Sequence, residues 1–502
     1  MKKIISLLLA VLTAAGVFMA CDSKKDEDKK IPDSAQTGTE AAGTQAGSEE
    51  SAGEAQIEPD LPEGVDYGGY TFTFLAHLYE GDDWLSSLPL ELVAEEQSGE
   101  PVNDAVYKRN LKIKERYNID IKMTGDANEM SAVKKAVGAG DGIYDAVLMF
   151  NNNVPGIASA DLLTNIDDLP YVDLAKPWWD PALNAMSVDG KNFLLAGDLL
   201  ILDNEATNVL LFNKDLMATL AMELPYGLVN SGKWTMDKFN EYIKGAAGDL
   251  NGDGSMSPAD DRWGFVAFND TLHALLVGGG GALAVKDEND LPHMDFTSPR
   301  NLTVIEKSMD IMYNKSDVLN IQADIPASAT WTEMYVNSFE QNRALFIWVR
   351  MRIVEKFRNM ESNFGIIPMP KFDENQEKYY SVVNPYTGAL IGVPKSAEDL
   401  ERVSIILEAL SAESRYTLQP AYYDVVLQRK YARDEESSEM LDIIFNSRIY
   451  DIGAVYSFGN AFVDFIGLCN KSDRNVVSYY EKKQGAMGRA IDKVVDIFRS
   501  ME

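Results

Sequence analysis

The run YDAVLMF at residues 144–150 constrains the fold of this 502-residue chain more than any other feature. The run is apolar at nearly every position, whereas a strand with one face in water would alternate apolar and polar residues. A strand of this kind is expected inside a parallel sheet that helices cover on both faces. The run therefore predicts an α/β fold.

Other strand-like runs recur along the chain between helix-like stretches. These runs are YTFTFL (70–75), NIDIKM (118–123), NVLLF (208–212), WGFVAF (263–268), RALFIWV (343–349), FGIIPMP (364–370) and GALIGVP (388–394). Residues 397–412 place apolar side chains three and four positions apart, as helices do. Strands that alternate with helices are typical of mostly parallel sheets, and a chain of this length is expected to form two or more lobes.

The net charge excludes some classes of partner. The chain has 78 acidic and 46 basic residues, which gives a formal charge of −32. Binding to a nucleic-acid backbone requires clustered Lys and Arg, so we expect no nucleic-acid partner. An anionic lipid surface would also repel this protein unless a covalent anchor held it there. The two cysteines, Cys21 and Cys469, are too few for a disulfide framework.

Residues 1–20 have the pattern of a signal peptide. Lys2 and Lys3 precede an uncharged, mostly apolar run at residues 4–20. The run ends in FMAC (18–21), which resembles a bacterial lipobox, where a signal peptidase cuts before the cysteine and the thiol is acylated. We therefore expect a palmitate-type lipid on Cys21 and a location on the extracytoplasmic face of the bacterial cell membrane. An uncleaved anchor, or a secretory signal in which Cys21 is incidental, is the alternative.

The composition changes directly after this signal. Residues 22–66 contain no aromatic side chain and are rich in Ser, Thr, Gly, Ala, Gln and Glu. Such a segment cannot bury enough apolar surface to offset the entropy that ordering would cost. Residues 21–66 are therefore predicted to form a flexible acidic tether that begins at the lipidated cysteine.

The segment DLNGDGSMSPAD (249–260) has the spacing of a calcium-binding loop. Oxygen ligands are expected at alternating positions, and Gly254 permits the sharp turn. The predicted ligands are Asp249, Asn251, Asp253, Ser255 through its backbone carbonyl, and Asp260. Asp260 stands where sensor loops carry a bidentate Glu, and Asp261 beside it could substitute or assist. A single loop of this kind predicts a structural Ca²⁺ ion, and an acidic turn without an ion is the alternative.

The common catalytic motifs are absent from the sequence. There is no phosphate-binding P-loop, no G-x-S-x-G elbow and no dinucleotide-binding glycine fingerprint. The three histidines (His77, His273 and His293) are too scattered to indicate a zinc site. We therefore predict no catalytic residue. A surface glycoside hydrolase with paired carboxylates stays open as an alternative, because spacing neither singles out nor excludes a pair.

Five longer segments follow one another in an order that resembles a known family. They are residues 144–169 (beginning YDAVLMFNNN), 204–216 (NEATNVLLFNKDL), 232–239 (GKWTMDKF), 338–349 (SFEQNRALFIWV) and 364–401 (beginning FGIIPMPKFD). Over about residues 65–465 the chain resembles the bacterial extracellular solute-binding proteins of family 1. These are the maltose-binding-like substrate-binding lipoproteins of sugar ABC importers.

The resemblance implies a two-lobed periplasmic-binding-protein-like fold of type II. Each lobe would hold a mixed, mostly parallel sheet flanked by helices, with the ligand cleft at the hinge. The expected boundaries are 67–200 plus 343–385 for lobe 1, and 201–342 plus 386–502, with the loop 249–260, for lobe 2. The implied function is capture of a sugar or oligosaccharide and its delivery to the transmembrane permease subunits, by a monomer without catalysis.

The resemblance also implies which residues face the ligand. Sugars are bound by aromatic faces against C–H surfaces and by polar side chains that hydrogen-bond to hydroxyls. The expected ligand-binding residues are Tyr79, Glu80, Trp84, Phe150, Asn151, Asn152, Glu205, Asp270, Trp348, Tyr386 and Tyr456. For each aromatic residue, and for Trp348 and Trp84 in particular, packing in the core is the alternative.

Overall fold

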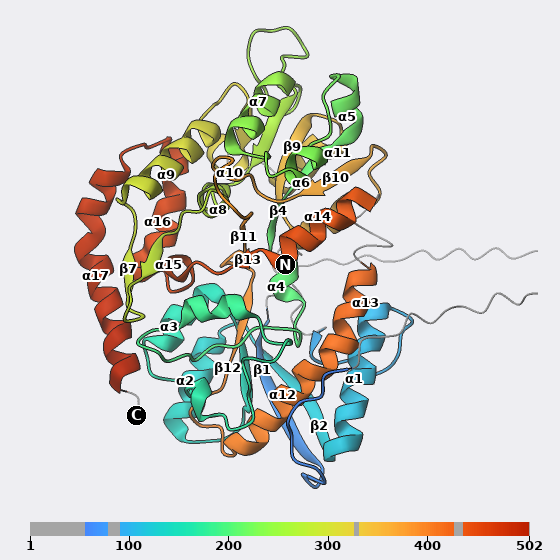
Figure 1. Ribbon diagram of the computed structural model, residues 1–502, viewed down its shortest axis with the longest axis vertical. Helices are drawn as coiled ribbons and strands as arrows, with labels where there is room; N and C mark the ends of the chain where they lie inside the picture. The colour runs from blue at the N-terminus through green and yellow to red at the C-terminus, as the bar shows by residue number, and fades with distance from the viewer. Residues whose placement is uncertain (1–55, 79–90, 326–330, 426–434, 501–502) are drawn as a thin grey trace, which may run out of the picture. The chain divides into compact units, whose positions relative to one another are not determined.

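The computed structural model of the chain describes residues 56–78, 91–325, 331–425 and 435–500 (Figure 1). Residues Gln56–Glu502 form one compact unit. The predicted signal peptide, Cys21 and most of the predicted tether lie outside the described residues, and so do Tyr79, Glu80 and Trp84.

Two sheets organise the described chain, together with two small ladders of two strands each. The helices that accompany them are α1 (Pro101–Tyr117), α2 (Glu129–Ala139), α3 (Val154–Ala158), α4 (Leu202–Glu205), α5 (Lys214–Thr219), α6 (Tyr226–Asn230), α7 (Met236–Ala246), α8 (Thr271–Gly278), α9 (Pro299–Met312), α10 (Ile321–Asp324), α11 (Trp331–Glu340), α12 (Leu400–Tyr416), α13 (Leu418–Val425), α14 (Glu435–Asn446), α15 (Ile452–Val455), α16 (Ala461–Gly467) and α17 (Val476–Ser500). The small ladders pair β6 (Ala284–Lys286) with β7 (Pro292–Met294), and β11 (Ser381–Val382) with β13 (Arg448–Ile449).

The first sheet has the strand order β12-β3-β1-β2. Its strands are β1 (Tyr70–His77), β2 (Ile119–Asp126), β3 (Ala146–Phe150) and β12 (Ala389–Gly392). Strand β1 pairs in parallel with β2 and β3, whereas β12 pairs antiparallel with β3. Every residue of β3 is buried, which confirms the prediction of a strand without a face in water.

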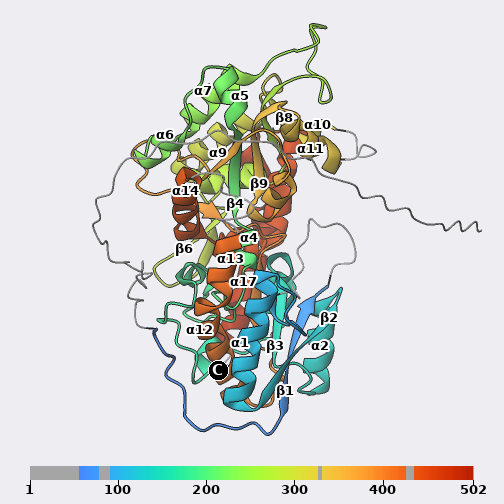
Figure 2. The ribbon, with the colours of Figure 1, turned by 90° about the vertical axis from the view of Figure 1, so that its right-hand side faces the viewer.

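Helices cover both faces of the first sheet (Figure 2). Phe74 of β1 lies on the face that packs against α1 and α12. The next residue, Leu75, points to the opposite face, where α2 packs together with part of α17. Successive side chains of a strand point to opposite faces, so a strand covered on both sides must be apolar throughout.

The second sheet has the strand order β10-β4-β9-β5-β8. Its strands are β4 (Asn208–Asn213), β5 (Trp263–Ala267), β8 (Val318–Asn320), β9 (Ala344–Arg350) and β10 (Phe364–Ile367). Strand β4 is antiparallel to β9 and β10, whereas β5 is parallel to β8 and β9. Phe346 lies on the face covered by α7, α8 and α9, and Ile347 on the face covered by α11 and α14. The mixed α/β class predicted from the sequence is confirmed.

The strand pairing corrects the expected division into lobes. Residues 343–385 were expected in lobe 1 with the first sheet, but β9 and β10 pair within the second sheet. Residues from 386 onward were expected in lobe 2, but β12 pairs with β3 in the first sheet. Near-continuous apolar runs specify that a strand is buried, and they do not specify which sheet buries it.

The predicted tether is also shorter than expected, because residues 56–66 contact the folded body. Leu61 and Val65 pack against the core beneath the first sheet. The backbone N–H of Ile57 donates to the Tyr416 hydroxyl (2.8 Å), and Asp60 pairs with Lys176 (2.8 Å).

In the described part of the chain, no helix is both long enough and apolar enough to span a bilayer.

The chain passes between the two sheets twice, and these two linking segments lie beside each other and beside strand β13. The first link leads through α4 into β4, and the second leads from β10 to β12. They meet where Thr207 bridges to Val383 and where the N–H of Asn384 donates to the carbonyl of Ala206 (2.9 Å). Strand β13 pairs with β11 within the second link. The three segments therefore form one hydrogen-bonded unit between the sheets.

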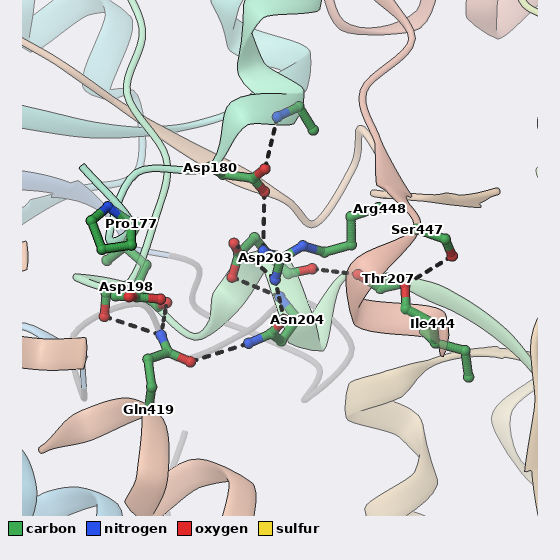
Figure 3. A network of polar contacts seen from close by, with 12 residues as sticks. Pro177, Asp180, Asp198, Asp203, Asn204, Thr207, Gln419, Ile444, Ser447 and Arg448 are labelled. Atoms are coloured by element: carbon green, nitrogen blue, oxygen red, sulfur yellow. Dashed lines mark hydrogen bonds and ion pairs between the residues drawn. The ribbon is translucent and has the colours of Figure 1, made fainter. Parts of the chain in front are cut away.

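Arg448 at the start of β13 connects these segments through its guanidinium group (Figure 3). Nη2 lies 3.1 Å from Oδ2 of Asp180, and Nη1 lies 3.2 Å from Oδ2 of Asp203. Nη1 also donates to Oδ1 of Asn204. Asp180 belongs to the segment that packs on the first sheet, since its N–H donates to Ala196 (2.9 Å). One side chain thus bridges a segment of the first sheet, the first link and β13.

The charges in this cluster are largely removed from water. The Arg448 side chain is 18% exposed, and the Asp180 and Asp203 side chains are about 5% exposed or less. Burial disfavours the charge of Arg448, but Asp203 and Asp180 outweigh it and raise its pKa above the usual value. Burial raises the pKa of Asp203 to about 6 even beside the guanidinium. The carboxylates therefore depend on Arg448 for compensation of their charge.

We predict that Arg448→Met destabilises the protein by about 3 kcal/mol, because it leaves buried carboxylates without their cation. The loss should be smaller at pH 5 than at pH 8, since a buried carboxyl with a raised pKa takes up a proton at low pH and becomes neutral. Urea titrations at both pH values measure the loss. Arg474→Met, which breaks the exposed ion pair with Asp310, is the matched control and should cost less than about 1 kcal/mol. Equal losses for the two variants would contradict the prediction.

Candidate functional site

A cavity of about 590 Å³ lies at the carboxyl ends of the strands of the first sheet. Strand β1 ends at His77, β3 ends at Phe150, and α2 begins at Glu129. Because β1 and β3 are parallel neighbours, both end at the same edge, and crevices outside this edge are where open α/β sheets bind ligands. The residues that line the cavity include His77, Glu129, Phe150, Asn152, Asn153 and Tyr386.

Three of the expected ligand-binding residues, Phe150, Asn152 and Tyr386, line this cavity together. Phe150 and Asn152 come from the end of β3, whereas Tyr386 comes from the link between β10 and β12. Tyr386 is held from behind by the ring of Phe462 (5.2 Å between centroids). Burial, with a smaller contribution from Asp270, raises the pKa of Tyr386 to about 12. The tyrosine therefore offers a ring face and a neutral hydroxyl.

Asn151 and Asp270 lie behind this surface and support the turn that carries Tyr386. The N–H of Asn151 donates to the carbonyl of Gly388 (2.9 Å), and the side chain of Asn151 is fully buried. A Cβ at position 388 would lie 2.7 Å from Nδ2 of Asn151, so a larger residue there would have to displace the Asn151 side chain. Asn384 donates through Nδ2 to Asp270 (2.9 Å) and accepts from the N–H of Tyr386 (3.0 Å).

Several buried side chains in the described part of the chain carry polar atoms without a hydrogen-bond partner, among them Asn151 and Thr387 at this turn. Among the described residues, the side-chain amide atoms of Asn151 and Asn208, Oγ1 of Thr387 and Nε1 of Trp348 have no hydrogen-bond partner. All four residues are at most 3% exposed. Buried polar groups are seldom left without a partner, so these atoms indicate where water or a ligand atom would be held.

Trp348 takes the position of a core residue. Its side chain is 3% exposed and belongs to the core on the α7, α8 and α9 face of the second sheet. The ring lies edge-on to Phe268 at 6.3 Å between centroids, and in the strand register it is opposite Leu210. This placement favours the packing alternative for Trp348 over a ring that faces a ligand.

Glu205 and Tyr456 do not line the cavity. Glu205 forms an ion pair with Arg352 (2.9 Å). Tyr456 is 2% exposed, stacks on Phe458 at 5.5 Å and donates its hydroxyl to the carbonyl of Met186 (3.1 Å). The structure therefore does not bring these two expected residues together with Phe150, Asn152 and Tyr386.

The cavity also contains residues that the sequence analysis did not anticipate, chiefly His77, Glu129 and Asn153. His77 is the last residue of β1, and the rule that sites form at strand ends could have indicated it. Asn153 follows the expected residues Asn151 and Asn152 at the end of β3, so the same rule could have indicated it, whereas Glu129 follows no motif and is distant from His77 in the sequence. Their role becomes visible only from the contacts among the three side chains.

The predicted calcium loop lies between α7 and β5, and a bridge between Gly248 and Arg262 closes its base. The carboxylate of Asp249 accepts from the N–H groups of Gly252 (2.6 Å) and Gly254 (2.8 Å). Asp253 accepts from the N–H of Ser255 (2.8 Å). The loop is therefore a series of turns with acidic side chains directed at its own backbone.

Asp261, and not Asp260, closes this loop onto its beginning. Its two oxygens accept from the N–H groups of Leu250 (2.8 Å) and Ser257 (2.6 Å). These backbone hydrogen bonds lower the pKa of Asp261. Asp260 accepts only from the Ser257 hydroxyl (3.1 Å) among described side chains. Within the described ranges, no group of three or more His, Cys, Asp or Glu side chains is arranged to hold a metal ion.

The fold is similar to those of several solved substrate-binding proteins. UspC of M. tuberculosis shares 13% identity, with 84% of this chain and 100% of that chain covered and a TM-score of 0.54. A cyclo/maltodextrin-binding protein complexed with maltotetraose shares 13% identity, with 89% and 100% covered and a TM-score of 0.51. The ABC substrate-binding protein Lmo0181 from Listeria monocytogenes, in complex with cycloalternan, shares 12% identity, with 85% and 98% covered and a TM-score of 0.50.

Identities this low establish the fold alone, and a comparison with curated proteins found no match. The comparison with family models is more specific. A model of the bacterial extracellular solute-binding proteins matches residues 94–403, which is more than half of the sequence. The match contains the whole second sheet, three strands of the first sheet (β2, β3 and β12, but not β1) and most of the residues that line the cavity. The chain therefore belongs to the family of bacterial extracellular solute-binding proteins.

Proposed function

We propose that this protein captures a sugar or an oligosaccharide and delivers it to the permease of an ABC importer, without catalysis. The observation that carries the proposal is the cavity at the end of the first sheet, where Phe150, Tyr386 and Asn152 converge. Aromatic faces and amide groups are the side chains that sugars require, for their C–H surfaces and hydroxyls respectively. The cavity volume is within the range of about 300–1,000 Å³ that is usual for small-molecule sites.

Two structural relatives support the choice of ligand class. The cyclo/maltodextrin-binding protein was solved with maltotetraose, and Lmo0181 was solved with cycloalternan. Both ligands are neutral oligosaccharides. A protein of this kind needs no reactive group, because a ligand that favours one arrangement of the two sheets shifts the equilibrium toward it, and the permease recognises that arrangement.

We predict that a neutral sugar raises the stability of the protein and leaves the solution chemically unchanged. At about 100 times its Kd, a ligand adds about 2.7 kcal/mol to the free energy of unfolding. A thermal-shift screen over mono- and oligosaccharides, followed by calorimetry, measures this effect. New reducing ends during prolonged incubation would favour the glycoside hydrolase alternative. A screen in which no sugar shifts the melting temperature would contradict the proposal.

The N-terminus extends the proposal to the membrane. Residues 1–20 act as a signal peptide and Cys21 carries the lipid, as the FMAC sequence supports. The lipid holds an acidic protein at a surface that would otherwise repel it. Anchoring keeps the binding protein close to the permease that it serves.

We predict that Cys21→Ser releases the protein from the membrane and leaves sugar binding unchanged, because the substitution removes only the acylated thiol. Fractionation of cells into membrane and soluble parts, with calorimetry on the released protein, tests this. Cys469→Ser is the matched control, because that thiol is buried in the folded body. A Cys21→Ser protein that stays in the membrane fraction as completely as the parent would refute the lipid anchor.

The loop 249–260 is proposed to bind one structural Ca²⁺ ion. Its support is the spacing of Asp249, Asn251 and Asp253 with a glycine at the turn. An ion would neutralise carboxylates that lie within one short loop of an already acidic protein. The ion would therefore stabilise the loop and the start of β5 without acting as a signal.

We predict that a Ca²⁺ chelator lowers the melting temperature and that Asp253→Ala abolishes this sensitivity. The reason is that hard cations need several carboxylate oxygens, and this variant loses one of them. Differential scanning calorimetry with and without chelator measures both effects. Asp287→Ala is the matched control, because Asp287 also caps a turn by accepting from Asn289 and Leu291. Identical melting curves with and without chelator in the parent protein would contradict the proposal and favour the alternative, an acidic turn that binds no ion.

A further inference from the structure

His77 lines the cavity, and one of its two ring nitrogens forms a hydrogen bond with a described residue. Nδ1 lies 2.6 Å from Oε2 of Glu129. Among the residues that the structure describes, none forms a hydrogen bond with Nε2. The side chain is 12% exposed and belongs to the cavity wall. Nε2 is therefore the nitrogen that remains for a bound molecule.

Glu129 determines which nitrogen of His77 carries the hydrogen. The Glu129 side chain is completely buried, and its other oxygen, Oε1, accepts from Nδ2 of Asn153 (2.6 Å). A carboxylate only accepts hydrogen bonds, so the contact with His77 requires the hydrogen on Nδ1. In the neutral imidazole, Nε2 is then an acceptor.

The ring of His77 is also held in one orientation. Its centroid lies 4.6 Å from that of Phe150, at an interplanar angle of 54°. The contact with Glu129 prevents rotation of the ring about its own axis. A side chain held on two sides loses little further freedom when a ligand binds, which favours affinity.

We propose that Nε2 of His77 accepts a hydrogen bond from a hydroxyl of the bound sugar, and that Glu129 and Asn153 are positioning residues that present this nitrogen. This inference rests on the proposed function and makes it more specific. An acceptor at this point of the cavity selects a ligand group that donates. A neutral sugar with a hydroxyl opposite Nε2 can donate to it and is bound. A ligand with a carboxylate at the same position is rejected, because the carboxylate and Nε2 are both acceptors.

The first test compares two histidine variants by calorimetry. The probe is the sugar with the largest thermal shift in a panel of neutral oligosaccharides that includes maltotetraose and cycloalternan. His77→Phe keeps a ring against Phe150 and removes the acceptor, so the sugar should bind about tenfold more weakly. His293→Phe, a substitution at an exposed histidine on β7, should leave the affinity unchanged.

A double-mutant cycle identifies the hydroxyl. Monodeoxy analogues of the probe sugar are measured against the parent protein and His77→Phe. One analogue should bind the parent about tenfold more weakly than the intact sugar, yet bind His77→Phe as well as the intact sugar does. Coupling of this kind would not arise if His77 were only part of the packing.

The positioning role is tested with Glu129→Gln. Asn153 donates toward Oε1, so the amide oxygen should stay on that side and the NH₂ group should face Nδ1 of His77. An NH₂ group donates, which moves the ring hydrogen to Nε2 and converts the acceptor into a donor. Nitrogen-15 NMR of the histidine ring should show this change of tautomer, and sugar affinity should fall as in His77→Phe.

The outcomes separate this inference from the function on which it rests. If the parent protein binds a sugar and His77→Phe binds it equally well, the role of His77 is refuted and sugar capture stands. A hydrogen on Nε2 in the parent protein also refutes the inference. If the parent binds no sugar in the panel, the proposed function fails, and the inference fails with it.

Discussion

The ion pairs of Arg448 are the constraint on which the arrangement of the two sheets depends. Asp180 comes from the segment packed on the first sheet, Asp203 from the link into the second sheet, and Arg448 from β13. Burial of these two carboxylates in their charged form without a cation would cost several kcal/mol. Arg448 must therefore lie beside Asp180 and Asp203 for the first link to be buried between the sheets.

The cavity depends on the same region of the chain. Phe150 lines the cavity from the end of β3 in the first sheet. Tyr386 lines it from the link between β10 and β12. That link is tied to α4 through Asn384 and Ala206 and to β3 through Gly388 and Asn151. A movement of the links would therefore displace Tyr386 relative to Phe150. This provides a physical route from ligand contact to the arrangement of the sheets.

The sequence was sufficient for the fold class and for part of the site. Apolar runs such as 144–150 report burial directly, and three of the residues that the resemblance implied, Phe150, Asn152 and Tyr386, line one cavity. It was not sufficient for the sheet membership of β9 and β12, since an apolar strand is compatible with either sheet. The pairing of His77 with Glu129 also could not be read from it, because such a contact depends on the relative placement of β1 and α2.

The return of β12 to the first sheet has a consequence for the biosynthesis of the protein. Strand β3, near residue 150, is completed by β12, near residue 390, and β4 is paired on both sides by strands that follow residue 343. The strands of the second sheet all lie within residues 208–367, whereas the first sheet lacks β12 until the chain has passed through the whole second sheet. Pairing between such distant segments is slow, because the intervening loop must be closed first. The order of events is thus set by the chain's topology: the second sheet needs the chain only as far as residue 367, whereas the first sheet is complete only after residue 392 has been made.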